Sequence, residues 1–189
     1  MKRQVLLFLL LTTLISSLFI TAVSATTLVK LDFQEIVSRA QTIISGKVIN
    51  LENKVHTRNG KKIPYTYITI SVNDKLKGNS GSDIYTFKYE GGVIPEEEIR
   101  LTIGGMPEFE VGQEVFLFLN NDDSLVSPIV GFSQGRFSIV TDKKSGIKYI
   151  YNNAGEPVTE SFIFNDKTKD GQNPVNYEYF KNQIKSEIK

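Results

Sequence analysis

Acidic side chains are the residues in this sequence that could carry out a hydrolytic reaction together. Hydrolysis of a glycosidic bond needs two carboxyl groups about 5–10 Å apart across a cleft, one as the acid and one as the base or nucleophile. A β-sheet could bring such a pair together from distant positions, so a small hydrolase is one hypothesis. The absence of Trp makes a sugar-binding groove a weaker expectation. The candidate carboxylates are Glu90, Glu108, Glu110, Glu114 and Asp142.

His56 is the single histidine of the chain, which has no Cys. One His and no Cys exclude a two-His metal site, an HExxH peptidase motif, Cys-ligated zinc, a Cys nucleophile and disulfide bonds. A catalytic His also needs an orienting carboxylate and a nucleophile. The polar neighbours Lys54, Thr57 and Arg58 indicate a solvent-exposed loop. We therefore expect His56 at the surface, and we expect no metal or other cofactor.

Two polar clusters could bind a cation. Glu96, Glu97 and Glu98 are consecutive, so they cannot all point to one centre on a strand, and we expect a solvated loop. Residues 120–124, Asn-Asn-Asp-Asp-Ser, offer oxygen ligands of the kind that Ca²⁺ binds. They lack the spacing of a calcium-binding loop, and the same residue types favour a hairpin turn. We therefore predict a turn there.

Aromatic side chains alternate with polar ones in two predicted strands. They could form a stacking platform for a single-stranded nucleic acid. The chain has 22 basic and 21 acidic residues, however, and a nucleic-acid-binding protein normally has a clear basic excess. We therefore expect no nucleic-acid partner, and we expect these rings to be core residues or cross-strand pairs. The rings are Tyr65, Tyr67, Tyr85, Phe87 and Tyr89.

The first 25 residues have the pattern of an export signal. Lys2 and Arg3 precede an apolar run over residues 5–20, and a stretch of small residues ends at Ala25. Cleavage after Ala25 would leave a chain that begins at Thr26, is secreted or associated with the cell surface, and has no remaining membrane segment. An uncleaved anchor is the alternative, since the uncharged stretch is longer than the ~20 residues that cross a bilayer.

The remaining residues, 26–189, predict one domain that is mainly β. Asp32 with Glu35 forms a capping box and predicts a short helix over 32–40. Helical spacing after Asn173-Pro174 predicts a C-terminal helix from about residue 174. The apolar pattern predicts strands at 43–49, 65–73, 85–89, 100–102, 115–119, 125–130, 136–141 and 148–151. Many short strands with Gly- and Asn-rich turns are typical of a small OB-like closed β-barrel, here with one helix near each end.

The sequence Gly-Phe-Ser-Gln-Gly-Arg at residues 131–136 could be a binding turn or a tight bend. A tight bend needs a residue that tolerates positive φ, and glycine does so at no steric cost. We favour the bend.

Residues 40–48, AQTIISGKV, resemble the first barrel strand of tissue inhibitors of metalloproteinases and netrin-like modules. Residues 68–72 with Leu76-Lys77-Gly78, and then residues 111–118, continue the similarity in the same order. The chain also resembles uncharacterised secreted bacterial domains that have a Leu-Lys-Gly turn and a Gly-Gln/Glu-x-Val-x-Leu-Phe-Leu strand. The fold that the resemblance implies is an OB-type barrel.

The resemblance also implies a binding segment. Those inhibitors place the amine and carbonyl of an N-terminal Cys on the protease zinc, and the small hydroxyl residue that follows enters the specificity pocket. Thr27 matches the hydroxyl residue, whereas Thr26 stands where the family has its Cys. By this resemblance, Thr26 and Thr27 would contact a secreted protease.

The sequence favours binding over catalysis. No motif brings together a nucleophile, a base and an oxyanion site. We therefore expect a secreted, non-enzymatic binding module whose partner is a secreted protease or a cell-envelope protein. The alternative is a small secreted hydrolase that uses paired carboxylates.

Overall fold

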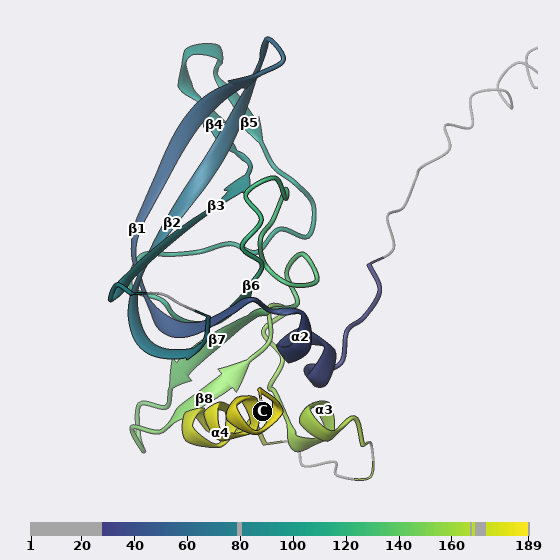
Figure 1. Cartoon of the computed structure of the whole chain (residues 1–189). Helices are drawn as coiled ribbons and strands as arrows, with labels where there is room; N and C mark the ends of the chain where they lie inside the picture. The colour runs from purple at the N-terminus through teal and green to yellow at the C-terminus, as the bar shows by residue number, and fades with distance from the viewer. Residues whose placement is uncertain (1–27, 79–80, 167, 169–172, 189) are drawn as a thin grey trace, which may run out of the picture.

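A computed structural model describes residues 28–78, 81–166, 168 and 173–188 (Figure 1). Within these residues, six strands form an antiparallel sheet in the order β3-β2-β1-β6-β7-β8, and β4 and β5 form a separate ribbon. The strands are β1 (Thr42–Arg58), β2 (Lys61–Lys77), β3 (Ile84–Glu90), β4 (Gly92–Ile94), β5 (Ile99–Leu101), β6 (Glu114–Leu119), β7 (Arg136–Thr141) and β8 (Lys148–Tyr151). The helices are α2 (Phe33–Arg39), α3 (Glu160–Phe164) and α4 (Tyr177–Glu187), with a 3-10 turn at Pro95–Glu97.

The predicted closed β-barrel is wrong, although the chain is mainly β as expected. β3 and β8 are the opposite edges of the six-stranded sheet and do not pair with each other. At the β8 edge, Ile150 N donates to Val175 O at 3.0 Å, and Val158 N donates to Ile150 O at 2.9 Å. At the β3 edge, Glu90 N donates to Val126 O at 2.8 Å. Irregular segments thus occupy part of each edge, which is one way in which an open sheet is protected.

The helices predicted near the two ends are confirmed. Asp32 caps α2, because its Oδ1 accepts from Glu35 N at 2.8 Å while Glu35 Oε2 accepts from Asp32 N at 3.1 Å. Asn176 caps α4 by accepting from Tyr179 N at 2.9 Å. The short helix α3 has no counterpart among the elements predicted from the sequence.

Each face of the six-stranded sheet has an apolar cluster. On one face, Phe116, Phe118 and Phe137 surround Phe180 of α4, with ring centroids 5.2–6.4 Å from that ring. On the other face, the cluster that includes Ile68 is covered by connecting segments that contribute Phe109 and Ile129. Successive residues of β1 alternate between the two clusters, as a strand buried on both sides requires.

β1 and β2 form a hairpin that extends well past the strands predicted at 43–49 and 65–73. Their pairing continues to Arg58 opposite Lys61. Asn59 and Gly60 form the turn with φ values of 54° and 74°, the conformation that a two-residue hairpin turn requires. Figure 1 shows the hairpin extending away from the helices, with β4 and β5 beside it.

The strand predicted at 125–130 does not form. Only Ile129 pairs there, in an isolated bridge with Leu119. Pro128 lacks a backbone N–H and therefore interrupts a ladder of hydrogen bonds at this point. The strands predicted at 136–141 and 148–151 are confirmed as β7 and β8.

Candidate binding face

The outer half of the β1–β2 hairpin and β3 share an exposed surface that we call the outer face. Alternate residues of a strand point to the same side, and the register places Lys54 opposite Tyr65 and Tyr67 opposite Lys88. A register shift between Val48 and Asn50 keeps Lys47 on the same side as the residues that follow. All the β1 residues of the outer face are exposed. The outer face comprises Lys47, Asn50, Glu52, Lys54, His56 and Arg58 of β1, Lys61, Ile63, Tyr65, Tyr67, Thr69 and Ser71 of β2, and Ile84, Thr86, Lys88 and Glu90 of β3.

Basic residues outnumber acidic residues on the outer face, although the whole chain is nearly balanced at 22 basic and 21 acidic residues. Its acidic residues are both paired: Lys54 Nζ lies 3.1 Å from Glu52 Oε2, and Arg58 Nη2 lies 2.9 Å from Glu90 Oε1. No carboxylate of the described residues lies within 4.0 Å of the ammonium groups of Lys47, Lys61 and Lys88. These three cations are available to a ligand.

Aromatic rings in contact with one another occupy the centre of the outer face. His56 Nε2 and Tyr67 Oη are 3.0 Å apart and share a hydrogen bond, and the His56 ring lies edge-on to the Tyr65 ring with centroids 5.1 Å apart. Lys54 Nζ is 4.9 Å from the Tyr67 centroid, and Lys88 Nζ is 5.3 Å from the Tyr65 centroid. Each ammonium therefore lies over an aromatic ring at cation–π distance. His56 is exposed, as predicted, but it lies in β1 and not in a loop, and its ring belongs to this cluster.

Tyr65 is the best-shielded ring of the outer face, with 8% of its surface exposed. Its hydroxyl donates to Glu90 Oε1 at 3.2 Å. Burial and the nearby Glu90 carboxylate raise the pKa of the Tyr65 phenol. The phenol therefore stays protonated and acts as a fixed hydrogen-bond donor rather than as an acid or a nucleophile.

The five rings predicted as core residues or cross-strand pairs do not form one platform. Tyr65 and Tyr67 belong to the outer face, whereas Tyr85, Phe87 and Tyr89 point to the opposite, inner face of the same sheet. Burial is the main cause that raises the pKa of Tyr85 and of Tyr89. The inner rings are therefore part of the core, as expected.

The inner face of the hairpin carries an acidic segment. Residues 91–112 cross it, and the Phe109 ring packs 5.8 Å from Phe87 and 6.5 Å from Tyr89. Glu97 Oε1 accepts from Lys62 Nζ at 2.8 Å, and this bond raises the pKa of Lys62. The exposed acids of the segment are Glu96, Glu97, Glu98, Glu108 and Glu110. Positive and negative charges are thus separated on the two sides of the hairpin.

The candidate catalytic carboxylates are divided among different surroundings. Glu90, Glu108 and Glu110 line one cavity of about 430 Å³ beside the inner face, but the Glu90 carboxylate is held by Arg58 and Tyr65 on the outer face. Glu108 and Glu110 are exposed residues of one loop, and a carboxylic acid catalyst needs shielding from water to keep its proton near neutral pH.

The two remaining carboxylates stabilise the fold. Glu114 Oε2 is 2.6 Å from Lys148 Nζ, which links β6 to β8. Asp142 accepts from the backbone and hydroxyl of Ser145, and these bonds lower the pKa of Asp142. Asp142 therefore caps a turn, and it does not line the cavity that Glu90, Glu108 and Glu110 share.

The loop at 120–124 is a turn, as predicted. Asp122 Oδ1 accepts from Ser124 N at 2.9 Å and from Ser124 Oγ at 2.6 Å. These bonds lower the pKa of Asp122. No group of three or more His, Asp or Glu side chains that could hold a metal ion is found among the residues whose positions are described.

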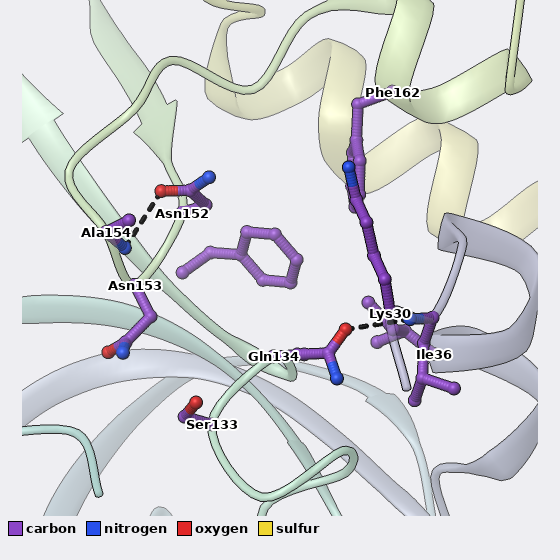
Figure 2. Close-up of a pocket in the computed structure, with 10 residues that line it drawn as sticks. Lys30, Ile36, Ser133, Gln134, Asn152, Asn153, Ala154 and Phe162 are labelled. Carbon is purple, nitrogen blue, oxygen red and sulfur yellow. Dashed lines mark hydrogen bonds between the residues drawn. The ribbon is translucent and has the colours of Figure 1, made fainter. Parts of the chain in front are cut away.

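Residues 131–136 form the expected bend, with φ of 62° at Gly131 and 70° at Phe132, and the bend also holds the N-terminal segment. Gln134 Oε1 accepts from Leu31 N at 2.8 Å, and Gln134 Nε2 donates to Val29 O at 2.8 Å. Figure 2 shows Gln134 between Lys30 and Ser133, at the edge of a cavity of about 240 Å³. Sequence reasoning missed Gln134 because its partners are a hundred positions away.

The predicted binding residues Thr26 and Thr27, and the predicted export signal at 1–25, lie outside the described residues. The described chain starts at Leu28, which is half exposed, and Gln134 fixes the backbone directly after it.

A polar network joins α4 to the sheet. Tyr177 Oη shares a 2.6 Å hydrogen bond with Ser45 Oγ and donates to Asp74 Oδ2. Lys181 Nζ lies 2.7 Å from Asp74 Oδ1. Burial alone would raise the pKa of Asp74, but the bonds from Lys181 and Tyr177 outweigh it and lower that pKa. Ser45 is fully buried, so no substrate can reach its hydroxyl, and the network serves packing.

Comparison with protein families, with curated proteins and with solved structures found no match for this chain. The resemblance to metalloproteinase inhibitors therefore stays a prediction, and the barrel that it implies is not formed. Among the described helices, none has the length and apolar character needed to cross a membrane.

Proposed function

We propose that this protein is an exported, non-enzymatic binding module whose partner binds to the outer face. The observation that carries the proposal is the pairing of free cations with fixed aromatic rings. Lys47, Lys61 and Lys88 have no described carboxylate partner, and they flank the ring cluster of His56 and Tyr65 on an exposed sheet surface.

The centre of the outer face is ordered before binding. Its side chains come from three paired strands, and ring and cation–π contacts restrict the rotamers of Lys54, Lys88 and the rings beside them. Ordering a mobile side chain at an interface costs about 0.5–1.5 kcal/mol, so a surface that is already ordered loses less free energy on binding.

The separation of charge favours an anionic partner in one orientation. The outer face attracts negative charge, while the acidic segment 91–112 beyond the inner face repels it. Complementary charge speeds association and suppresses wrong orientations.

The hydrolase alternative has less support. Glu108 and Glu110 are exposed on one loop, and the Glu90 carboxylate is already bound by Arg58 and Tyr65. An acid and base pair needs two carboxyl groups with different degrees of shielding on opposite sides of a substrate.

A comparison of two variants in a pull-down tests the proposal. The bait is the full-length gene product, in the form to which the cell processes it, and the sample is culture supernatant plus envelope extract. The outer variant is Lys61→Gln with Lys88→Gln, and the matched control is Arg100→Gln with Lys143→Gln, which removes equal charge elsewhere. We expect a component that the wild type and the control retain and the outer variant loses. Equal retention by all three would contradict the proposal.

A further inference from the structure

We propose that the ligand of the outer face is a linear phosphodiester polymer of the cell envelope, an inference that rests on the proposed function. The outer face runs from Lys47 to Arg58 along β1, a distance of about 36 Å at about 3.3 Å per residue. A polymer can follow this length, whereas a single small anion can contact one or two of its cations.

The cations are spread along this length on three neighbouring strands. Side chains on one face of a strand repeat about every 6.6 Å, and neighbouring strands are about 4.8 Å apart. The register places Lys61 at the tip beside Arg58, Lys88 across from Tyr67, and Lys47 at the base opposite Ser71. A chain with one fixed negative charge per repeat can therefore meet several ammonium groups at once.

Neutral donors lie between the cations. Thr69 Oγ1 and Thr86 Oγ1 are 3.2 Å apart on neighbouring strands, and one hydroxyl of this pair keeps a hydrogen free to donate to a ligand. Phosphate oxygens accept hydrogen bonds from hydroxyl and ammonium groups alike, and those from charged donors are the stronger ones. Tyr67 and His56 add flat surfaces for the carbon backbone of the polymer.

The composition of the outer face argues against a folded protein partner. Stable protein interfaces bury about 800 Å² on each side, and their centres are depleted in Lys and other charged residues. The centre of the outer face is Lys54, Tyr65 and Tyr67, and its aliphatic side chains, Ile63 and Ile84, lie toward its ends. The predicted export argues against a nucleic acid.

Binding to purified poly(glycerol phosphate) as a function of salt tests the inference. Release of counterions makes the logarithm of the binding constant fall linearly with the logarithm of salt, by about 0.7 per contacted charge for a flexible chain. With Lys47, Lys61 and Lys88 engaged, raising the salt from 50 to 200 mM should weaken wild-type binding on the order of 20-fold. Lys47→Gln with Lys61→Gln and Lys88→Gln should remove most of this salt dependence.

The control variant combines Arg100→Gln, Lys143→Gln and Lys144→Gln, exposed basic residues away from the outer face. It should keep the wild-type salt dependence. Circular dichroism and urea midpoints establish that both triple variants are folded. Equal weakening in the two variants would overturn the inference.

Two competitors separate the ligand classes. Glycerophosphoglycerol, the single repeat, should fail to compete at equal phosphate concentration, and single-stranded DNA of equal charge should compete no better than the polymer. Stronger competition by DNA would show recognition of bases and overturn the inference.

Failure of the wild type to bind the polymer at 50 mM salt would show that the inference is wrong. The proposed function would still stand if the pull-down captured a component through the outer face.

Discussion

The Lys88 ammonium lies 5.3 Å from the centroid of the Tyr65 ring, on the side of the sheet opposite the acidic segment 91–112. This contact holds a cation at the surface without pairing it to an acid. It also shields Tyr65, whose hydroxyl is bound to Glu90. The outer face is therefore ordered and still has positive charge available.

Charges on the outer face should matter little for folding. Exposed ion pairs and cation–π contacts contribute about 0–1 kcal/mol each. Lys54→Gln and Lys88→Gln should each lower the free energy of unfolding by less than about 1 kcal/mol in urea titrations. A loss of more than about 2 kcal/mol in either variant would mean that these residues serve the fold rather than a ligand.

Removing the Tyr177 hydroxyl should destabilise the protein. Tyr177→Phe leaves the buried Ser45 Oγ without this partner and takes one donor from Asp74. An unsatisfied buried polar group costs about 1–3 kcal/mol, which urea unfolding at pH 7 would measure. Tyr179→Phe on the same helix is the control: it removes a hydrogen bond to the exposed Glu160 carboxylate, leaves no buried group unpaired, and should cost less than about 1 kcal/mol. Equal stability of the two variants would show that the network does not hold α4.

The ionised Asp74 carboxylate should stabilise the folded protein at pH values above the normal titration range of a carboxyl group. Its pKa is lowered in the folded state, so the unfolded chain binds a proton at higher pH than the folded chain does. The contribution is complete above the normal carboxyl pKa of about 4 and is lost as the pH falls through the lower folded value. Asp74→Asn should cost about 1–3 kcal/mol at pH 7.

The gap in unfolding free energy between wild type and Asp74→Asn should narrow as the pH falls through the lowered pKa of folded Asp74. Urea titrations at pH 7, 4 and 2.5 would follow it. A gap that stays constant with pH would exclude an ionic role for Asp74.

Gln134 should anchor the N-terminal segment. Gln134→Ala removes the bonds to Leu31 N and Val29 O, at a cost of about 1–2 kcal/mol. Trypsin should then cleave after Lys30 faster than in the wild type, as mass spectrometry of the products would show. Asn153→Ala, which changes the same cavity, should leave the rate unchanged, and equal rates in all three proteins would refute the anchor.

Local signals allowed the helices and several strands to be predicted. The Asp32 and Glu35 capping box predicted α2, and the apolar spacing after Asn173-Pro174 predicted α4. β7 and β8 follow from alternation next to turn residues. These elements are specified by residues within a few positions of each other.

Features that depend on distant partners could not be predicted. The outer half of the hairpin is polar on its exposed side, so alternation of apolar residues does not extend to Arg58. Barrel closure depends on whether two edge strands meet, and here backbone groups of Val126 and Val175 bind at those edges. The outer face can be recognised only from the register of the strands, which places Lys88 opposite Tyr67.

The most direct test of the outer face as the binding surface is photo-crosslinking from two exposed threonines of the same sheet. Thr86 lies on the outer face, and Thr57 points to the inner face beside Lys62. A benzophenone amino acid replaces each in turn in the producing cell, and illumination is followed by purification of the adducts. We predict an envelope adduct from position 86 that is absent at position 57. Adducts from position 57 alone, or equal adducts from both positions, would contradict binding through the outer face.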